Sequence, residues 1–299
     1  MNRDRTAVLI TCHNRKPKTL ACLAALFNQA LSPEVTIEVY LVDDSSTDGT
    51  AEEVQQAYPQ VKILQGDGNL FWNGGMRKAF AEALKQDYDY YLWLNDDTVL
   101  YPEALSTLLA TSHYLVEQGD IHSIVVGSTQ DPENGALTYG GVVQEYRWHP
   151  LRFRLVQPNE TAQRCDTMNG NFVLIPRKVA QLVGNLAPEL IHYVADYDYG
   201  LRAKNQGCTV WVAPGYAGTC PLNPSQEGRL NSSQLLGEQL KKMSQPKGLR
   251  LKGVILYSFG EWKLFAQRHG GLFWPIYWLL PYRRLVGSLL FGKLKRDGV

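Results

Sequence analysis

The sequence lacks long apolar runs and any strong excess of one charge. Thirty Lys and Arg residues stand against 29 Asp and Glu, which gives a formal net charge of +1. That balance argues against the positive field with which proteins attract phosphate backbones, so no nucleic-acid partner is expected. No uninterrupted apolar stretch reaches about 18 residues, so no transmembrane helix is predicted. The run Ala7 to Ile10 is too short for a secretory signal, and we interpret it as a first strand.

Cysteine is also scarce. The five cysteines are odd in number and form no CxxC pair, which argues against a disulfide framework and a structural zinc site. A reducing cytoplasm is therefore the expected compartment. Of the 299 residues, 44% are hydrophobic and only 20% are charged, so the chain is expected to fold around a sizeable core.

Short apolar segments alternate with segments of helical spacing through the first 100 residues. Strands are predicted over residues 7–11, 36–42, 61–64 and 90–94, and helices over 17–29, 51–58 and 75–86. This alternation predicts an α/β fold with a Rossmann-like, mostly parallel central sheet flanked by helices.

The layout changes after Pro102, which opens a further helix. Residues 124–164 are Gly-rich and strand-like, as expected of hairpins. The remaining expected elements are strands over 171–176 and 209–212 and helices over 177–183 and 196–206. Beyond Pro221 the composition becomes polar, then aromatic and basic. We therefore predict one domain over residues 1–222 and a helical extension over 223–299.

Polar residues gather where the predicted strands end, which is where open parallel sheets bind ligands. The clusters are Thr11-Cys12-His13-Asn14-Arg15, Asp43-Asp44-Ser45-Ser46, Asn95-Asp96-Asp97 and the loop leading to Asp196. Asp43 and Asp44 either begin an Asx-type turn that caps a helix or accept hydrogen bonds from a nucleotide.

The acids after the strand over residues 90–94 suggest a cation site. Unpaired charge is costly beside a buried strand, and Mg²⁺ or Mn²⁺ binds through one or two carboxylates plus substrate phosphates. A helix-initiating turn is the alternative for Asn95-Asp96-Asp97. Asp196 and Asp198 stand near a helix start, where the macrodipole favours acids even without chemistry. Their side chains point in different directions, so only one is expected to face a ligand.

The chain resembles family 2 glycosyltransferases of the GT-A fold in the order and spacing of six motifs. They are VLITCHNR, LVDDSSTDGT, GNLFWNGGMRKAF, WLNDDT, NGNFVLIPR and HYVADYDYGLRAKNQG. The resemblance spans residues 7–220. Within the family, the chain is most similar to bacterial rhamnosyltransferase-like and galactofuranosyltransferase-like enzymes. It implies a nucleotide-sugar donor, Mg²⁺ or Mn²⁺ as cofactor, and inverting transfer to a hydroxyl of a glycan or lipid-linked acceptor in cell-surface polysaccharide synthesis.

The resemblance also implies roles for single residues. Asp97 would be the metal ligand at the family's DxD position, and Asp196 would be the catalytic base. The wider donor site would contain Thr11, Asn14, Arg15, Asp43, Asp44, Trp72, Asn73, Gly74, Gly75, Asp96, Asp198 and Arg202, with the last two supporting the helix of the base.

Three positions depart from the family pattern. Asn95 replaces the first Asp of DxD, and Ala195 replaces the acid that often precedes the base. Some relatives carry a histidine metal ligand after the last strand, where this chain reads GTCPLN. Cys220 is therefore either a substitute ligand or a buried thiol.

Two other functional classes are open to the sequence. A catalytically silent sugar-nucleotide-binding module would keep the donor site and act through partners, although the intact acids argue against it. A Rossmann dehydrogenase is disfavoured because GDGNLF lacks the third glycine of GxGxxG.

The segment Trp262 to Arg296 mixes aromatic and basic residues, and two prolines interrupt it. We predict that it lies on the cytoplasmic face of the inner membrane as a peripheral contact. Its basic residues would meet anionic headgroups; they are Arg268, Arg283, Arg284, Lys293, Lys295 and Arg296. The alternative is that it packs on the first domain or on a second copy of the chain in a homo-oligomer.

Overall fold

The computed structural model describes residues 4–222, 249–251, 254–256 and 258–283. It divides into two compact units, one of residues 1–143 with 154–223 and one of residues 144–153 with 224–299. The short segment 144–153 thus groups with the C-terminal part of the chain.

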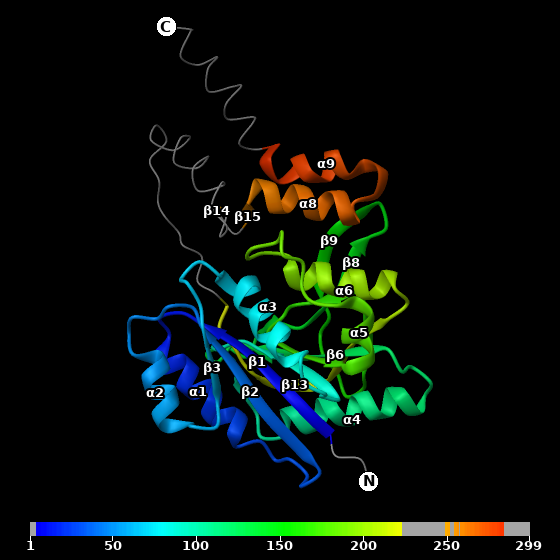
Figure 1. Cartoon of the computed structure of the whole chain (residues 1–299). Coiled ribbons are helices and arrows are strands. Elements are labelled where there is room, and N and C mark those ends of the chain that lie inside the picture. Colours follow the sequence, from blue (N-terminus) through cyan, green and yellow to red (C-terminus); the bar gives the residue numbers. More distant parts are fainter. Residues whose placement is uncertain (1–3, 223–248, 252–253, 257, 284–299) are drawn as a thin grey trace, which may run out of the picture. The chain divides into compact units, whose positions relative to one another are not determined.

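A ten-stranded sheet forms the centre of the first unit (Figure 1). Its strands are β1 (Asp4–Cys12), β2 (Val35–Asp43), β3 (Lys62–Gln65), β4 (Tyr90–Leu94), β5 (Val99–Leu100), β6 (Ser123–Gln130), β7 (Leu137–Tyr139), β10 (Gln163–Cys165), β12 (Phe172–Pro176) and β13 (Thr209–Thr219). The strand order is β10-β13-β6-β12-β4-β1-β2-β3, with β5 paired to β13 and β7 to β6. Strands β3, β2, β1 and β4 run parallel, and β12 lies antiparallel between β4 and β6.

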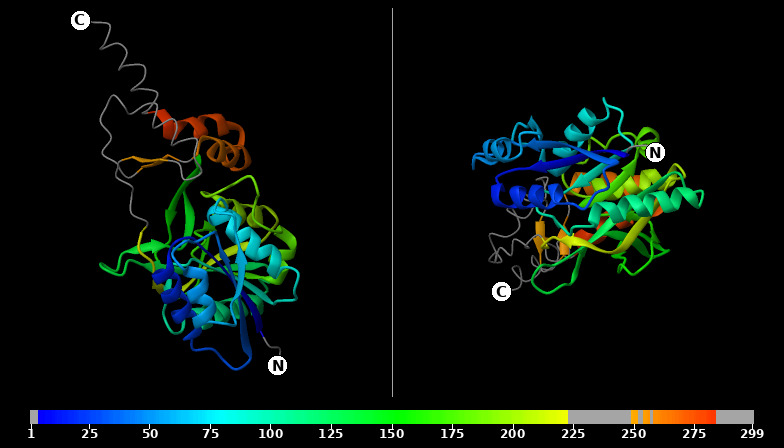
Figure 2. Two further views of the ribbon diagram at one scale, coloured as in Figure 1. Left: turned by 60° about the vertical axis from the view of Figure 1, so that its left-hand side comes forward. Right: turned by 90° about the horizontal axis from the view of Figure 1, so that it is seen from below.

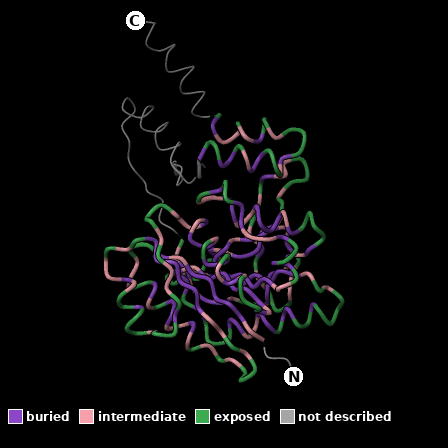
Figure 3. Tube along the Cα trace, in the orientation of Figure 1, coloured by how far each residue is buried: buried purple, intermediate pink, exposed green. Residues whose placement is uncertain are grey.

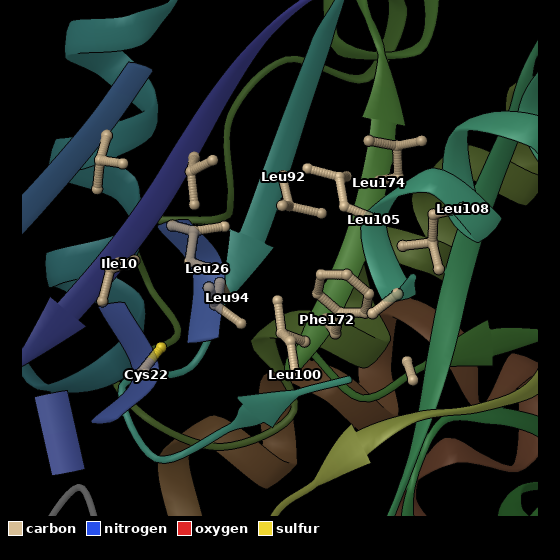
Figure 4. Close-up of a cluster of buried hydrophobic side chains, with 14 of the residues drawn as sticks. Ile10, Cys22, Leu26, Leu92, Leu94, Leu100, Leu105, Leu108, Phe172 and Leu174 are labelled. Atoms are coloured by element: carbon tan, nitrogen blue, oxygen red, sulfur yellow. The ribbon is translucent and has the colours of Figure 1, made fainter. Parts of the chain in front are cut away.

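Helices cover both faces of this sheet. They are α1 (Lys16–Phe27), α2 (Thr50–Ala57), α3 (Phe71–Ala83), α4 (Ala104–Glu117), α5 (Arg177–Val183) and α6 (Ala195–Asn205). One core layer joins Leu92 and Leu94 of β4 to Leu26 of α1 and Leu105 of α4 (Figure 4). In the right-hand view of Figure 2, α1 and α4 accordingly lie in one layer. The predicted α/β fold with a mostly parallel central sheet and flanking helices is confirmed.

The alternating residues of β4 build the opposite layer. Trp93 is fully buried, with its ring 4.9 Å from that of Tyr199 on α6 and 6.2 Å from that of Phe80 on α3. Strand β4 is buried along its whole length, as its continuous apolar sequence predicts. Figure 3 shows that buried chain runs through the central sheet of the first unit. This packing fixes the end of β4, and with it the start of the acidic loop that follows.

Most predicted bounds differ from the observed ones by a few residues, and the largest differences are in α3 and β13. Helix α3 begins at Phe71, four residues before the predicted start. Strand β13 continues to Thr219 instead of ending at 212, and its pairing with β6 shifts register between Val212 and Gly218. Pro214 and Gly215 read as strand breakers in the sequence, but the irregular pairing accommodates them. The longer strand carries Cys220 to the carboxyl end of the sheet.

Hairpin strands occupy the predicted region 124–164. Strands β8 (Gly141–Tyr146), β9 (His149–Leu155) and β11 (Thr167–Met168) form a three-stranded sheet in the order β11-β8-β9. The other elements of the C-terminal part are β14 (Leu249–Leu251), β15 (Val254–Leu256), α8 (Phe259–His269), η1 (Gly271–Phe273), α9 (Trp274–Leu279) and η2 (Leu280–Tyr282).

The second unit has its own small core. Trp262, Phe265 and Ala266 of α8 are buried, as is Tyr277 of α9. The Tyr277 hydroxyl donates a hydrogen bond to the backbone carbonyl of Trp148 in the same unit. Among the described residues, no helix has both the length and the apolar character needed to cross a membrane.

Candidate active site

The loops that leave β1, β2 and β4 meet at one edge of the sheet. Parallel pairing sets Cys12 beside Asp43 and Leu9 beside Trp93, so the polar clusters that follow these strands become neighbours. Within the described part of the chain, four non-glycine residues have positive φ: Asn14 (51°), Ser45 (56°), Phe71 (54°) and Val194 (55°). Such backbone costs energy, and it concentrates at functional sites. All four lie in or next to the predicted site segments.

Asn14 ties the first two loops together. Its side-chain Oδ1 accepts a hydrogen bond from the Thr47 backbone N–H at 2.7 Å, and its own N–H donates to Ser46 Oγ at 2.9 Å. Thr11 lies near the end of β1, three positions before Asn14. The predicted nucleotide contacts of Thr11 and Asn14 stay predictions.

The two acids after β2 are buried and engaged with backbone amides. Asp44 accepts hydrogen bonds from the N–H groups of Gly68, Leu70 and Phe71 at 2.8, 3.0 and 3.2 Å. Asp43 accepts one from the Ser46 N–H at 3.2 Å. The Asp43 contact is typical of an Asx-type turn, whereas Asp44 holds the start of α3 and does not cap the next helix, α2. Their predicted nucleotide contacts remain untested.

The acids after β4 share one cation from the protein itself. Arg15 Nη1 lies 3.1 Å from Asp96 Oδ1 and 2.9 Å from Asp97 Oδ2. Asp96 and Asp97 are only 5% and 7% exposed. Lys18 Nζ is farther away, 4.0 Å from Asp97 Oδ2. The predicted metal position is therefore a buried acid pair already in contact with a guanidinium.

The acid pair retains unused capacity for a cation. Asp96 Oδ2 is buried and has no hydrogen-bond partner in the part of the chain that the structure describes. Burial raises the pKa of the Asp96 carboxyl to about 7, while the adjacent Arg15 guanidinium acts to lower it. Within the described ranges, no three His, Cys, Asp or Glu side chains form a metal cluster. The residues fit an ion held by one or two carboxylates and completed by phosphates and water, not a closed protein cage.

Cys220 lies beside this pair. Its Sγ is 3.5 Å from Asp97 Oδ1 and accepts a hydrogen bond from Asn171 Nδ2 at 3.4 Å. Burial, reinforced by the Asp97 charge, raises the pKa of the Cys220 thiol to about 12. The thiol therefore keeps its proton at neutral pH and acts as a weak donor to Asp97.

Asp196 opens helix α6 next to a glycine. Its Oδ2 accepts a hydrogen bond from the Gly170 N–H at 2.9 Å, and its Oδ1 accepts one from the Tyr197 N–H at 2.8 Å. Burial raises the pKa of the Asp196 carboxyl to about 6, against these two hydrogen bonds that lower it. A carboxylate with a pKa near the working pH suits general-base catalysis.

Trp72 connects the base position to the acidic loop. Its Nε1 donates to Asn95 Oδ1 at 2.7 Å. A Cβ added to Gly170 would lie 2.4 Å from the Trp72 ring and 3.3 Å from Asp196 Cβ, so the indole and the carboxylate pack around this glycine. Sequence reasoning assigned no role to Gly170. The signal was the NGN triplet, a glycine between two amides directly before a strand.

Asp198 and Arg202 support α6 from behind. Arg202 Nε donates to the buried Asp198 Oδ2 at 2.8 Å, and its other nitrogens donate to the backbone carbonyls of Val183 and Asn185. The supporting role that the resemblance implied for these two residues stays a prediction. Only Asp196 of the two acids is partly exposed at the site.

The segment Trp72-Asn73-Gly74-Gly75 is mainly a packing element. Asn73 is 1% exposed, and its Nδ2 donates to the carbonyls of Ala187 and Leu190. A Cβ on Gly75 would lie 2.0 Å from Thr11 Oγ1, so the glycine lets α3 approach the end of β1. Contacts of these residues with a donor remain predictions.

Comparison with known sequences identifies the family. The chain matches the model described as Glycosyl transferase family 2 over residues 7–180. It is 28% identical over 166 residues to galactofuranosyltransferase GlfT2 of Mycobacterium tuberculosis, covering 50% of this chain and 26% of that protein. It is 23% identical over 229 residues to N-acetylglucosaminyl-diphospho-decaprenol L-rhamnosyltransferase of the same species, covering 68% and 72%. Protein RfbJ of Shigella flexneri is 30% identical over 131 residues, covering 43% and 87%.

Solved structures show the same fold. The mannosyltransferase PcManGT of Pyrobaculum calidifontis, solved with GDP-Man and Mn²⁺, aligns with a TM-score of 0.54 at 14% identity over 94% of this chain and 70% of that chain. TarS of S. aureus aligns with a TM-score of 0.54 at 12% identity over 88% and 42%. The predicted rhamnosyltransferase-like and galactofuranosyltransferase-like resemblance is confirmed by the named relatives. The chain belongs to glycosyl transferase family 2, and this membership assigns it to the glycosyltransferase class of enzymes.

Proposed function

We propose that the chain moves a sugar, with inversion, from a nucleotide-diphosphate sugar to a hydroxyl of a glycan or lipid-linked acceptor. The supporting observation is the Asp196 carboxylate, which two backbone N–H groups hold in place and which Trp72 and Asn95 connect to the acidic loop. The name of the rhamnosyltransferase relative includes a diphospho-decaprenol, which favours a lipid-linked acceptor in polysaccharide synthesis.

In this reaction Asp196 removes the proton of the acceptor hydroxyl. The oxygen bonds to the anomeric carbon as the bond to the diphosphate breaks, and the proton stays on Asp196. The Gly170 and Tyr197 N–H groups fix the carboxylate in position and favour its charged form. The Trp72 ring packs against Gly170, whose N–H holds the base.

Asp97, with Asp96, would hold Mg²⁺ or Mn²⁺. When bound, the ion would neutralise the negative charge that develops on the departing diphosphate. The partnerless Asp96 Oδ2 supports this assignment. The mannosyltransferase of the same fold that was solved with Mn²⁺ makes that ion a natural first choice for experiments.

We expect activity to rise with pH through about 6. Asp196 must be deprotonated to act as a base, and burial holds its pKa near 6. The value of kcat/KM should therefore fall about tenfold for each pH unit below that value and level off above it. Donor affinity, measured over the same pH range, shows separately how pH affects the proposed metal site at Asp96 and Asp97. A profile that stays flat down to pH 4.5 would remove Asp196 as the base.

The C-terminal unit presents an apolar and basic surface that fits a membrane. Leu272 is 94% exposed, Phe273 62% and Ile276 56%. The exposed charges between residues 258 and 283 are all basic: Lys263, Arg268 and Arg283. Apolar side chains beside basic ones suit an anionic membrane interface, at the cytoplasmic face in this proposal. Arg284, Lys293, Lys295 and Arg296 lie outside the described residues, and the division into residues 1–222 and 223–299 remains a proposal.

Replacing Leu272 and Phe273 together by serine should weaken co-sedimentation of the full chain with anionic vesicles by about tenfold or more. The loss follows from removing two exposed apolar side chains, each of which contributes roughly 1.5–3 kcal/mol when buried. Val116→Ser, on the first unit, changes a 45% exposed residue and should have no effect. Binding of the parent chain should weaken with salt. Parent protein that ignores anionic vesicles at low salt would leave packing or a homo-oligomer as the role of this surface.

A further inference from the structure

Arg15 occupies an unusual position between the two acids of the proposed metal site. One nitrogen, Nη1, contacts both Asp96 and Asp97, at 3.1 and 2.9 Å. The side chains of the acids are 6% and 5% exposed, whereas the Arg15 side chain is 39% exposed. The guanidinium therefore neutralises two buried carboxylates while itself remaining open to solvent.

We propose that Arg15 is the resident counter-ion of the Asp96–Asp97 pair in the donor-free protein and competes with the divalent cation for Asp97. The inference rests on the proposed metal role of Asp97. Asp97 Oδ2 cannot serve the guanidinium and a metal ion at full strength, because two cations on one oxygen repel each other. A metal ion alone therefore binds weakly.

The donor removes this competition. Its diphosphate is anionic, and arginine forms strong bidentate contacts with phosphate oxygens. Because the Arg15 side chain is partly exposed, it can turn toward a diphosphate without a rearrangement of α1. The carboxylates are then available, so metal and donor bind together instead of metal binding first. Arg15 in this account is a positioning residue that links the two ligands.

The acid pair also has the oxygens needed for an exchange of cations. Among the described residues, Asp96 Oδ2 has no hydrogen-bond partner, and Asp97 Oδ1 lies 3.5 Å from the weakly polar Cys220 thiol. Arg15 thus satisfies one oxygen of each acid and leaves the other under-used. Lys18 adds positive charge at 4.0 Å from Asp97 but is half exposed, so solvent screens it.

The test is Mn²⁺ binding to the donor-free full chain. The electron paramagnetic resonance signal of free Mn²⁺ measures how much of the ion is bound. Arg15→Gln should bind Mn²⁺ at least about tenfold more tightly than the parent, because removing an adjacent charge shifts such equilibria by one or more powers of ten. Lys18→Gln also removes one positive charge near Asp97, but from a solvent-exposed side chain, and it should change the Mn²⁺ affinity less than about twofold. Unchanged or weaker binding by Arg15→Gln would overturn the inference.

Two further variants keep the outcome clear. Arg15→Met retains the aliphatic stem and is the second neutral variant if glutamine impairs folding; it should show the same gain, and no gain would again count against the inference. Adding Asp97→Asn to Arg15→Gln should abolish the gain. Tight binding that survives Asp97→Asn would refute the metal role of Asp97 itself. If Asp97→Asn weakens Mn²⁺ binding but Arg15→Gln does not strengthen it, only the role of Arg15 is refuted.

Discussion

Replacing Asp196 with asparagine should leave donor affinity within about twofold of the parent and lower the transfer rate by on the order of 10²–10⁴-fold. Asparagine keeps the size of the side chain, and its single carbonyl oxygen can still accept the hydrogen bond from the Gly170 N–H, whereas its amide nitrogen cannot accept the one from the Tyr197 N–H. It also loses the ability to take a proton. The measurement is kcat with a saturating donor, beside donor binding by calorimetry.

The matched control is Asp166→Asn. Asp166 lies outside the proposed site and pairs with Lys204 of α6, the helix that also carries Asp196. The control therefore removes one carboxylate near α6 without changing the base. Its transfer rate should stay within about twofold of the parent, as surface ion pairs contribute little. Near-parental turnover by Asp196→Asn would refute the base assignment.

Asp97→Asn should abolish the metal dependence of donor binding and weaken that binding by at least about tenfold. The cause is that the donor diphosphate would lose its shared cation, and one opposite charge at close range is worth one or more powers of ten. EDTA should have the same effect on the parent protein. Both effects are measured as the donor affinity of the parent and of Asp97→Asn, with Mn²⁺ and with EDTA.

Asp87→Asn provides the comparison for this variant. Asp87 is a surface acid whose side chain is 79% exposed and which pairs with Arg177. Its removal should leave metal-dependent donor binding intact. A parent enzyme that retains full activity after exhaustive chelation would remove the metal from the proposed mechanism.

The sequence pattern was sufficient to predict the sheet and the edge that carries the site. A short continuous apolar run is typical of a strand buried on both faces, so Tyr90 to Leu94 could be identified as a strand with exact bounds. The polar clusters then had to meet, because the carboxyl ends of parallel strands lie at one edge. The start of β13 was predicted, but its continuation beyond Val212 was not, because Pro214 and Gly215 break the pattern and pairing with β6 and β5 extends the strand to Thr219.

The partners of the site residues could not be predicted in the same way. Asp44 reads as a ligand-facing acid, yet three backbone N–H groups from a loop more than 20 residues away use its oxygens. Arg15 and Asp97 are 82 residues apart in sequence, and nothing local marks them as a pair. Such contacts depend on loop geometry and on side-chain rotamers, which motif order does not encode. The motif positions were informative, whereas the role of each residue required the structure.

The most direct test of the account is consumption of donor by the full chain. A panel of nucleotide-diphosphate sugars is incubated with Mn²⁺ and polyprenyl-diphosphate-linked sugar acceptors, and release of the nucleoside diphosphate is measured together with the product. At least one donor should be consumed, with one elongated acceptor formed for each nucleoside diphosphate released and with little consumption by Asp196→Asn. A chain that binds a donor tightly yet consumes none across the panel would not be a glycosyltransferase of this kind, and a catalytically silent binding module would be favoured.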